Sequence, residues 1–130
     1  MDIKEFAQKF IDAEHQVIQQ GNFDALEEIE SPDLIFHLPP MPDLVGFEAH
    51  KQYLVSSMET VSELTQDWDY IAGDGNIAVL SVIQKMTFKV EHPMLKLPAG
   101  SKVTADGFFV LRRENDKVAE IWTHNNMTVE

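Results

Sequence analysis

The stretch IWTHNNM, residues 121–127, joins a large aromatic ring to three polar side chains in a segment that reads as a β-strand. Because alternate side chains of a strand face the same way, Trp122, His124 and Asn126 share one face. His124 has a reference pKa of about 6.5 and could exchange a proton near neutral pH. Asn126 can only donate and accept hydrogen bonds. The pattern therefore indicates a base beside a group that could hold a ligand oxygen.

Glu14 is a second candidate acid or base. Apolar residues recur at spacings of three and four over the first segment, and Glu14 falls on the stripe that they form on a helix. A carboxyl group in an apolar cavity has a raised pKa and could act as an acid or base. A structural ion pair with Arg112 or a lysine is the alternative, and the sequence leaves both open.

The other histidines form no recognisable metal-binding motif. His15, His37, His50 and His92 are scattered, without the helical spacing of paired zinc ligands. We expect His37 to face outward beside a proline stop, and His50, next to Lys51, to lie on the surface. There is no glycine-rich phosphate loop and no nucleophile motif. From these patterns we expect neither a metal nor a cofactor.

The elements that must position these residues are helices first and strands later. The periodicity predicts helices over 3–20, 22–29 and 46–61, and strands over 34–38, 64–72, 77–90, 102–114 and 118–129, with a loop at 91–101. This order, α-α-β-α-β-β-β-β, predicts a single α+β domain over residues 1–130. We expect a curved, mostly antiparallel sheet with the helices on its concave face and a cavity at its wide end.

Composition limits the partners. The chain has 130 residues, 22 acidic and 10 basic, and a formal net charge of −12. This charge opposes binding to nucleic acid or to an anionic membrane, which both require clustered Lys and Arg. No apolar run approaches the roughly 20 residues that span a bilayer, and the first ten residues do not resemble a signal peptide. We expect a cytoplasmic protein.

Several stretches resemble the NTF2-like superfamily and, within it, the SnoaL-like polyketide cyclase group. They are QQGNFDALEEIESPDLIFHLPP, VGFEAHKQYL, LPAGSKV and RRENDKVAEIWTHNN, in the order and spacing of that group. The resemblance implies a cone-shaped α+β barrel with an apolar pocket. Both faces of strand 102–114 carry aromatic residues, so we also expect a homodimer through the outer sheet face.

The resemblance also identifies positions at which catalytic residues are expected. SnoaL-like cyclases use an aspartate four residues after the position of Trp122, and this chain has Asn126 there. The related ketosteroid isomerases use a tyrosine and two aspartates, at positions that align with Glu14, Leu38 and approximately Phe108. None of these residues matches, so the chain departs from both known mechanisms.

Family geometry implies that the row of Trp122, His124 and Asn126 faces the cavity, with Thr123 and Asn125 outward. It also favours Asp106 and Phe108 as the inward residues of their strand. The apolar row of strand 64–72 adds Trp68 and Tyr70, and the short strand contributes Phe36 and Leu38. This mixture of apolar walls and few polar groups suits a small apolar molecule that carries a carbonyl or hydroxyl group.

Two functions remain open at this point. The first is a binding module for such a molecule, without chemistry of its own. The second is a small isomerase- or cyclase-type enzyme that abstracts a proton next to a carbonyl. In that enzyme His124 or Glu14 is the base, and Asn126 hydrogen-bonds the developing enolate oxygen. The missing aspartates favour the first function, whereas His124 and Glu14 support the second.

Overall fold

The computed structural model describes residues 1–92 and 96–130. Its helices are α1 (Ile3–Gln20), α2 (Asp24–Ile29) and α3 (Phe47–Glu59), and its strands are β1 (Glu30–His37), β2 (Leu44–Val45), β3 (Val61–Asp74), β4 (Ile77–Phe88), β5 (Lys102–Glu114) and β6 (Lys117–Val129). The predicted order of helices and long strands is therefore confirmed. The middle of the predicted 91–101 loop, residues 93–95, lies outside the described residues.

Helix α1 has the ends that its sequence predicts. The side chain of Asp2 accepts a hydrogen bond from the backbone N–H of Glu5, which caps the N-terminus. Gly21 ends the helix in the left-handed conformation, with φ at 65°, and its N–H bonds back to the carbonyl of Val17. Because both ends are fixed, the apolar stripe of α1 is held against the sheet along its length.

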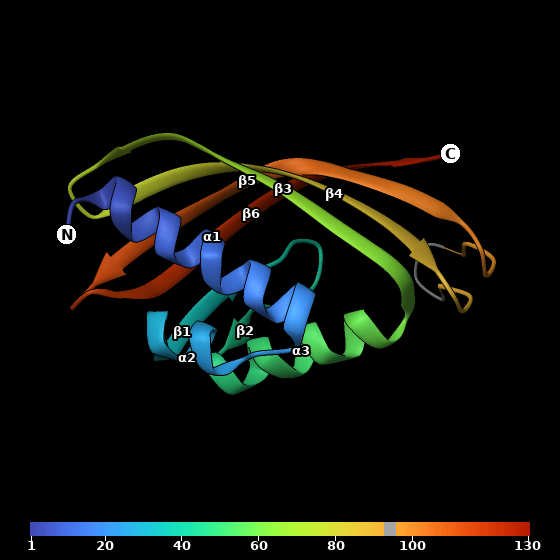
Figure 1. The fold of residues 1–130 in the computed structure, drawn as a ribbon, viewed down its shortest axis with the longest axis horizontal. Helices are drawn as coiled ribbons and strands as arrows, with labels where there is room; N and C mark the ends of the chain where they lie inside the picture. The colour runs from blue at the N-terminus through green and yellow to red at the C-terminus, as the bar shows by residue number, and fades with distance from the viewer. Residues whose placement is uncertain (93–95) are drawn as a thin grey trace.

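The strands form one open sheet in the order β2-β1-β6-β5-β4-β3. β3 to β6 are joined as antiparallel neighbours, and β1 pairs with β6 in parallel. The fold is therefore α+β with a mixed sheet, as predicted. The barrel is not closed, because β2 and β3 are edges that do not meet. Figure 1 shows the sheet arching over α1, with α2 and α3 on the same side.

Local differences from the predicted elements lie at β1, β2 and β3. β3 begins at Val61, which was predicted as the last residue of the third helix, because the strand period starts there. β1 begins at Glu30, four residues earlier than the predicted strand, and a register shift separates its first pair from the rest. The short strand β2 was not predicted, because two residues are too few to show a period. The early start pairs Glu30 with Val118 of β6, and β2 pairs with β1 at the edge of the sheet.

Aromatic rings pack the space between α1 and the sheet. Phe109 of β5 lies 5.0 Å from Trp68 and 5.9 Å from Phe36, measured between ring centroids, and both contacts are edge-on. Phe10 of α1 contacts Trp68 edge-on at 5.9 Å. All four rings are buried. These rings fill this part of the predicted cavity.

Candidate functional site

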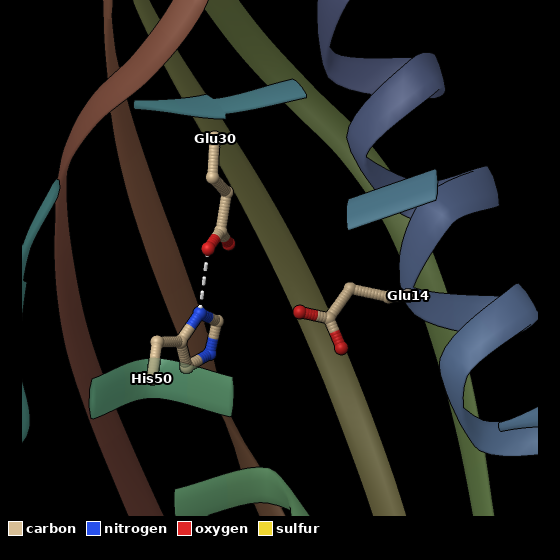
Figure 2. A group of neighbouring side chains, drawn as sticks. All are labelled: Glu14, Glu30 and His50. Carbon is tan, nitrogen blue, oxygen red and sulfur yellow. Dashed lines mark hydrogen bonds and ion pairs between the residues drawn. The ribbon is translucent and has the colours of Figure 1, made fainter. Parts of the chain in front are cut away.

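Three titratable side chains meet in the interior: Glu14, Glu30 and His50. Figure 2 shows them converging from α1, from the start of β1 and from α3. Each offers one ligand-type atom, and these atoms all lie within 4.8 Å of one another. The three residues are almost completely buried, with exposed fractions of 1–3%. A buried group of this kind, drawn from three separate elements, is the strongest candidate site among the described residues.

The hydrogen bonding in this cluster is incomplete. His50 Nδ1 lies 2.8 Å from Glu30 Oε1, and the ring of His50 packs against Phe36 at 4.5 Å. The second carboxylate oxygen of Glu30, Oε2, is buried and has no hydrogen-bond partner. Among residues 1–92 and 96–130, no hydrogen bond or ion pair ends on Glu14. Buried polar groups without partners are unusual in folded proteins.

Burial dominates the electrostatics of the cluster. It raises the pKa of Glu14 to about 7, although the nearby charge of His50 opposes this rise. It also raises the pKa of Glu30, against the hydrogen bond with His50. For His50, burial lowers the pKa, but the hydrogen bond and charge of Glu30, with the charge of Glu14, leave it above its ordinary value. Protons in this cluster are therefore held to higher pH than in water.

The helical period explains why two of these residues are inside. Glu14 follows Phe10 by four residues and therefore points into the same side of α1. His50 follows Phe47 by three residues, and Leu54 and Met58 continue the same face of α3. The expectation that His50 lies on the surface is therefore wrong, because it occupies an apolar-stripe position. This spacing was the signal that could have found it.

Glu30 gave no such signal. It follows Ile29 at the junction of α2 with β1, where neither a helical nor a strand period is established. The alternative of a structural ion pair between Glu14 and Arg112 is also wrong. Arg112 lies on the other side of the sheet and pairs with Glu114 and Glu120.

These three residues could hold a metal ion. Two carboxylates and an imidazole are ordinary ligands for divalent transition metals. The sequence spacing predicted no metal site, because the three ligands lie on separate elements and share no motif. Their convergence can be recognised only in three dimensions.

An open groove lies between the C-terminal ends of α1 and α3 and the start of β3. Its volume is about 480 Å³, and its lining comprises Ile18, Met58, Val61, Ser62, Glu63, Leu64 and Thr65. Ile18 follows Glu14 by one helical turn, and Met58 follows His50 by two turns. The volume lies within the usual range for small-molecule sites.

Four of the residues predicted to line the interior do face it. Phe36 and Trp68 are buried, and Leu38 and Tyr70 are partly buried against the same core. Their orientation is confirmed, while their role in binding a ligand stays a prediction. Trp68 is held by its packing and also donates a hydrogen bond from Nε1 to Gln66.

The predicted orientation of the closing strand is wrong. Trp122, His124 and Asn126 do share one face, but this is the outer face of the sheet, where all three are exposed. In the register of β5 with β6, Phe108 lies opposite His124, and Asp106 opposite Asn126. Asp106 and Phe108 are therefore exposed on the outer face as well. The structure does not bring His124 or Asn126 together with Glu14.

The two rows of β5 explain this reversal. The inner row is Val103, Ala105, Gly107, Phe109 and Leu111, whereas the outer row includes Asp106 and Arg112. Burying those charges would cost more than exposing Phe108. On β6, Thr123 and Asn125 accordingly face inward, contrary to the prediction. The Asn125 Oδ1 atom is buried without a partner beside Gly107.

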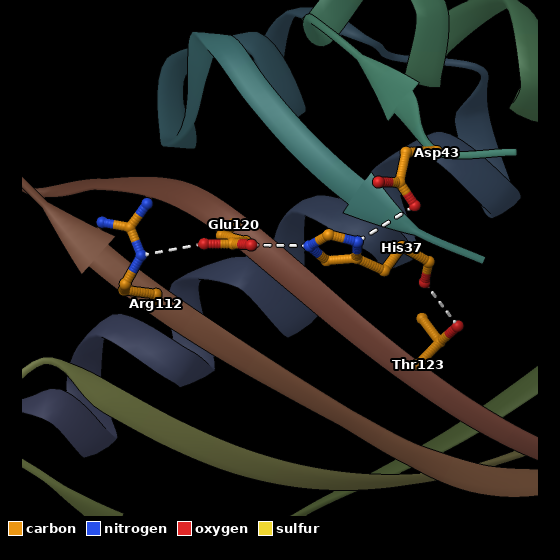
Figure 3. A network of polar contacts seen from close by, with 5 residues as sticks. All are labelled: His37, Asp43, Arg112, Glu120 and Thr123. Atoms are coloured by element: carbon orange, nitrogen blue, oxygen red, sulfur yellow. Dashed lines mark hydrogen bonds and ion pairs between the residues drawn. The ribbon is translucent and has the colours of Figure 1, made fainter. Parts of the chain in front are cut away.

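The outer face carries a polar network of its own, centred on His37. Figure 3 shows the ring of His37 between Asp43, at 3.0 Å, and Glu120, at 2.5 Å, with Arg112 on the far side of Glu120. The hydrogen bond to Glu120 raises the pKa of His37, and the same contact lowers the pKa of Glu120. His37 also stacks on Trp122 at 5.5 Å. The outward orientation predicted for His37 is thus confirmed.

Comparison with known proteins is decisive for the family. The sequence model of the SnoaL-like domain matches residues 7–121.

The chain belongs to the SnoaL-like family.

Solved structures support the same fold for this SnoaL-like chain. TsrD from Streptomyces laurentii superposes with a TM-score of 0.80 at 17% identity, covering 97% of this chain and 91% of TsrD. SalBIII, an epoxide hydrolase/cyclase-like enzyme in pyran ring formation in the polyether salinomycin, gives 0.77 at 16% identity, covering 99% and 98%. An NTF2-like protein of unknown function from Burkholderia pseudomallei gives 0.74 at 15% identity, covering 93% and 90%.

These identities support the fold and do not carry an activity to this chain. A search of curated protein sequences gave no significant match. Within the described residues, none of the helices has both the length and the apolar character needed to cross a membrane.

Proposed function

We propose that this SnoaL-like protein binds a small, mostly apolar molecule that carries a carbonyl or hydroxyl oxygen. The apolar body lies in the groove beside Ile18 and Met58, and the oxygen reaches the Glu14–Glu30–His50 cluster. The supporting observation is the unsatisfied hydrogen-bonding capacity of that cluster. Glu30 Oε2 is buried without a partner, and among residues 1–92 and 96–130 no hydrogen bond or ion pair ends on Glu14.

Hydrogen-bond chemistry favours such a ligand. A hydroxyl group can donate to a carboxylate oxygen, and a carbonyl oxygen can accept from a protonated Glu14 or from the ring of His50. Leaving a buried polar group unpaired costs about 1–3 kcal/mol, so a ligand that pairs it gains a comparable amount. Glu14 is buried in the structure, so neighbouring side chains must shift to admit the ligand oxygen.

A thermal-shift screen of apolar ketones and alcohols tests this proposal. The unfolding temperature of the wild-type chain should rise with a subset of these compounds, in metal-chelating buffer. Met58→Trp, which fills the groove, should lose the response, while Phe108→Ala on the outer face should keep it. The proposal is contradicted if no compound acts, or if Met58→Trp responds as the wild type does.

A second candidate function is proton abstraction next to a carbonyl, with Glu14 as the base. Its supporting observation is that Glu14 is buried and has no protein partner among the described residues, so it can exchange a proton with a bound ligand. The ring of His50 would donate a hydrogen bond to the ligand oxygen, and Glu30 would orient that ring through its contact with Nδ1. Deuterium exchange at the α-carbon of a bound ketone in D₂O should occur with the wild type and stop in Glu14→Gln. Exchange that survives this substitution would exclude Glu14 as the base.

A homodimer through the outer sheet face is the third part of the proposal. Ile83, Phe108 and Trp122 are exposed on the neighbouring strands β4, β5 and β6. Exposed apolar patches of this kind commonly mark interfaces. Sedimentation of the wild type should show a dimer that Phe108→Asp dissociates. A wild type that sediments as a monomer at micromolar concentration would contradict the interface.

A further inference from the structure

We propose that Glu14, Glu30 and His50 form a binding site for one divalent transition-metal ion, of the class of Zn²⁺ or Mn²⁺. This inference goes beyond the proposed function, because binding a small molecule in the groove requires no cation. It rests on the positions of the three side chains and on their unpaired atoms.

The distances fit a site that is nearly assembled. Bonds from such metals to protein O and N atoms are about 2.0–2.2 Å. Adjacent ligand atoms around one ion are therefore about 3.0–3.5 Å apart. His50 Nδ1 and Glu30 Oε1 are 2.8 Å apart in a hydrogen bond, and an ion bound between them would displace the proton that they share. All three ligand atoms lie within 4.8 Å, so an approach of about 1–2 Å by the flexible Glu14 side chain completes the set.

The unpaired buried oxygens fit a cation-binding site better than a solvated acidic patch. Glu30 Oε2 is buried and without a partner, and the Glu14 carboxyl is directed toward the same point in Figure 2. Among residues 1–92 and 96–130, neither carboxyl has a Lys or Arg in an ion pair. Buried carboxylates are normally paired with a cationic side chain or coordinate a metal.

Charge and ligand type select the class of ion. Two ionised carboxylates and a neutral imidazole carry a charge of −2, which a divalent cation balances. An imidazole ligand favours Zn²⁺, Mn²⁺, Fe²⁺ or Co²⁺ over Ca²⁺ and Mg²⁺, which prefer oxygen ligands. Three protein ligands leave at least one coordination position for water or a ligand oxygen. A cation there would hold Glu14 ionised and exclude it from proton transfer.

Titration of metal-free protein with CoCl₂ tests the site directly. The protein is first dialysed against a chelator, and binding is followed by visible absorption and by elemental analysis after dialysis. The wild type should take up one Co²⁺ per chain with a new absorption band. Binding should weaken at least about tenfold in Glu14→Gln and in Glu30→Gln. His124→Gln, which changes an exposed histidine on the outer face, should bind as the wild type does.

A second measurement needs no variant at the cluster. In the wild type, paramagnetic Co²⁺ should shift or broaden the NMR signals of the His50 ring and leave those of His124 unchanged. The proposal is overturned if the wild type binds no Co²⁺, if Glu14→Gln binds it equally well, or if His124 responds in place of His50. These results leave the thermal-shift screen unaffected, because that screen is done in chelating buffer.

Discussion

Replacing Phe109 and Phe108 with alanine, one at a time, should destabilise the protein by very different amounts. Phe109 is 8% exposed and contacts the rings of Phe36 and Trp68. Truncating a packed aromatic residue of this kind costs about 3–5 kcal/mol. Phe108 is 49% exposed, and full burial of such a side chain contributes about 1.5–3 kcal/mol, so its truncation should cost about 1 kcal/mol.

Urea unfolding followed by circular dichroism gives both free energies. The measurement is repeated over a range of protein concentrations, because loss of a dimer contact by Phe108→Ala would make its cost depend on concentration. When the free energies of unfolding are extrapolated to the monomer, Phe109→Ala should lose more stability than Phe108→Ala, by about 2 kcal/mol or more. Equal costs, or a larger cost for Phe108→Ala, would refute the assignment of the inner face.

Three further predictions concern the cluster, the inner row and the outer network. In chelating buffer, the free energy of unfolding of the wild type should fall as pH rises from 5 to 8. Folded Glu14 keeps its proton up to a pKa of about 7, whereas the unfolded carboxyl loses it near 4.5, and the difference is worth about 2–3 kcal/mol. The Glu14→Gln variant should lack this loss, and parallel pH curves for the two proteins in urea unfolding would contradict the prediction. Gly107→Ala should destabilise the protein by about 3 kcal/mol in thermal unfolding, because its Cβ would overlap the carbonyl oxygen of His124. A near-neutral effect would contradict the close approach of β6 to Gly107. An NMR titration should give His37 a pKa above 6.5, because the hydrogen bond to Glu120 raises it. This pKa should fall in Glu120→Gln, and an unchanged pKa in that variant would exclude the contact as the cause.

Element order and helix ends could be predicted because their signals are local. The stripe of α1, the left-handed Gly21 and the two-residue period of β3 each depend on neighbouring residues. The strand β2 and the parallel pairing of β1 with β6 could not be predicted, since they depend on contacts between distant segments. The sequence also could not show that the sheet stays open, because this depends on β2 and β3 remaining unpaired edges.

The candidate site could be predicted only in part. Glu14 was identified because a charged residue on an apolar stripe is conspicuous, and His50 occupies the equivalent place on α3. Neither a helical nor a strand periodicity surrounds Glu30, so it is recognised only through its contact with His50 in the structure. Two of the three residues were therefore accessible from helical spacing, and the third was not.

The closing strand shows why a row of functional-looking residues misleads. The alternation of side chains along a strand places Trp122, His124 and Asn126 on one face. It does not show whether that face is the inner or the outer face of the sheet. The partner strand decides this, because exposing Asp106 and Arg112 avoids burying two charges. Weighing the charges along β5, in place of the family geometry alone, would have given the correct face.

The most direct test of the central claim is the pKa of Glu14 itself. The claim is that the functional centre lies in the interior, at a carboxyl that the protein keeps dry and unpaired. A pH titration of the Glu14 carboxyl carbon by NMR, in metal-free protein, should give a midpoint near 7. A midpoint near the ordinary 4.5 would mean that Glu14 is solvated or paired, and would contradict the account.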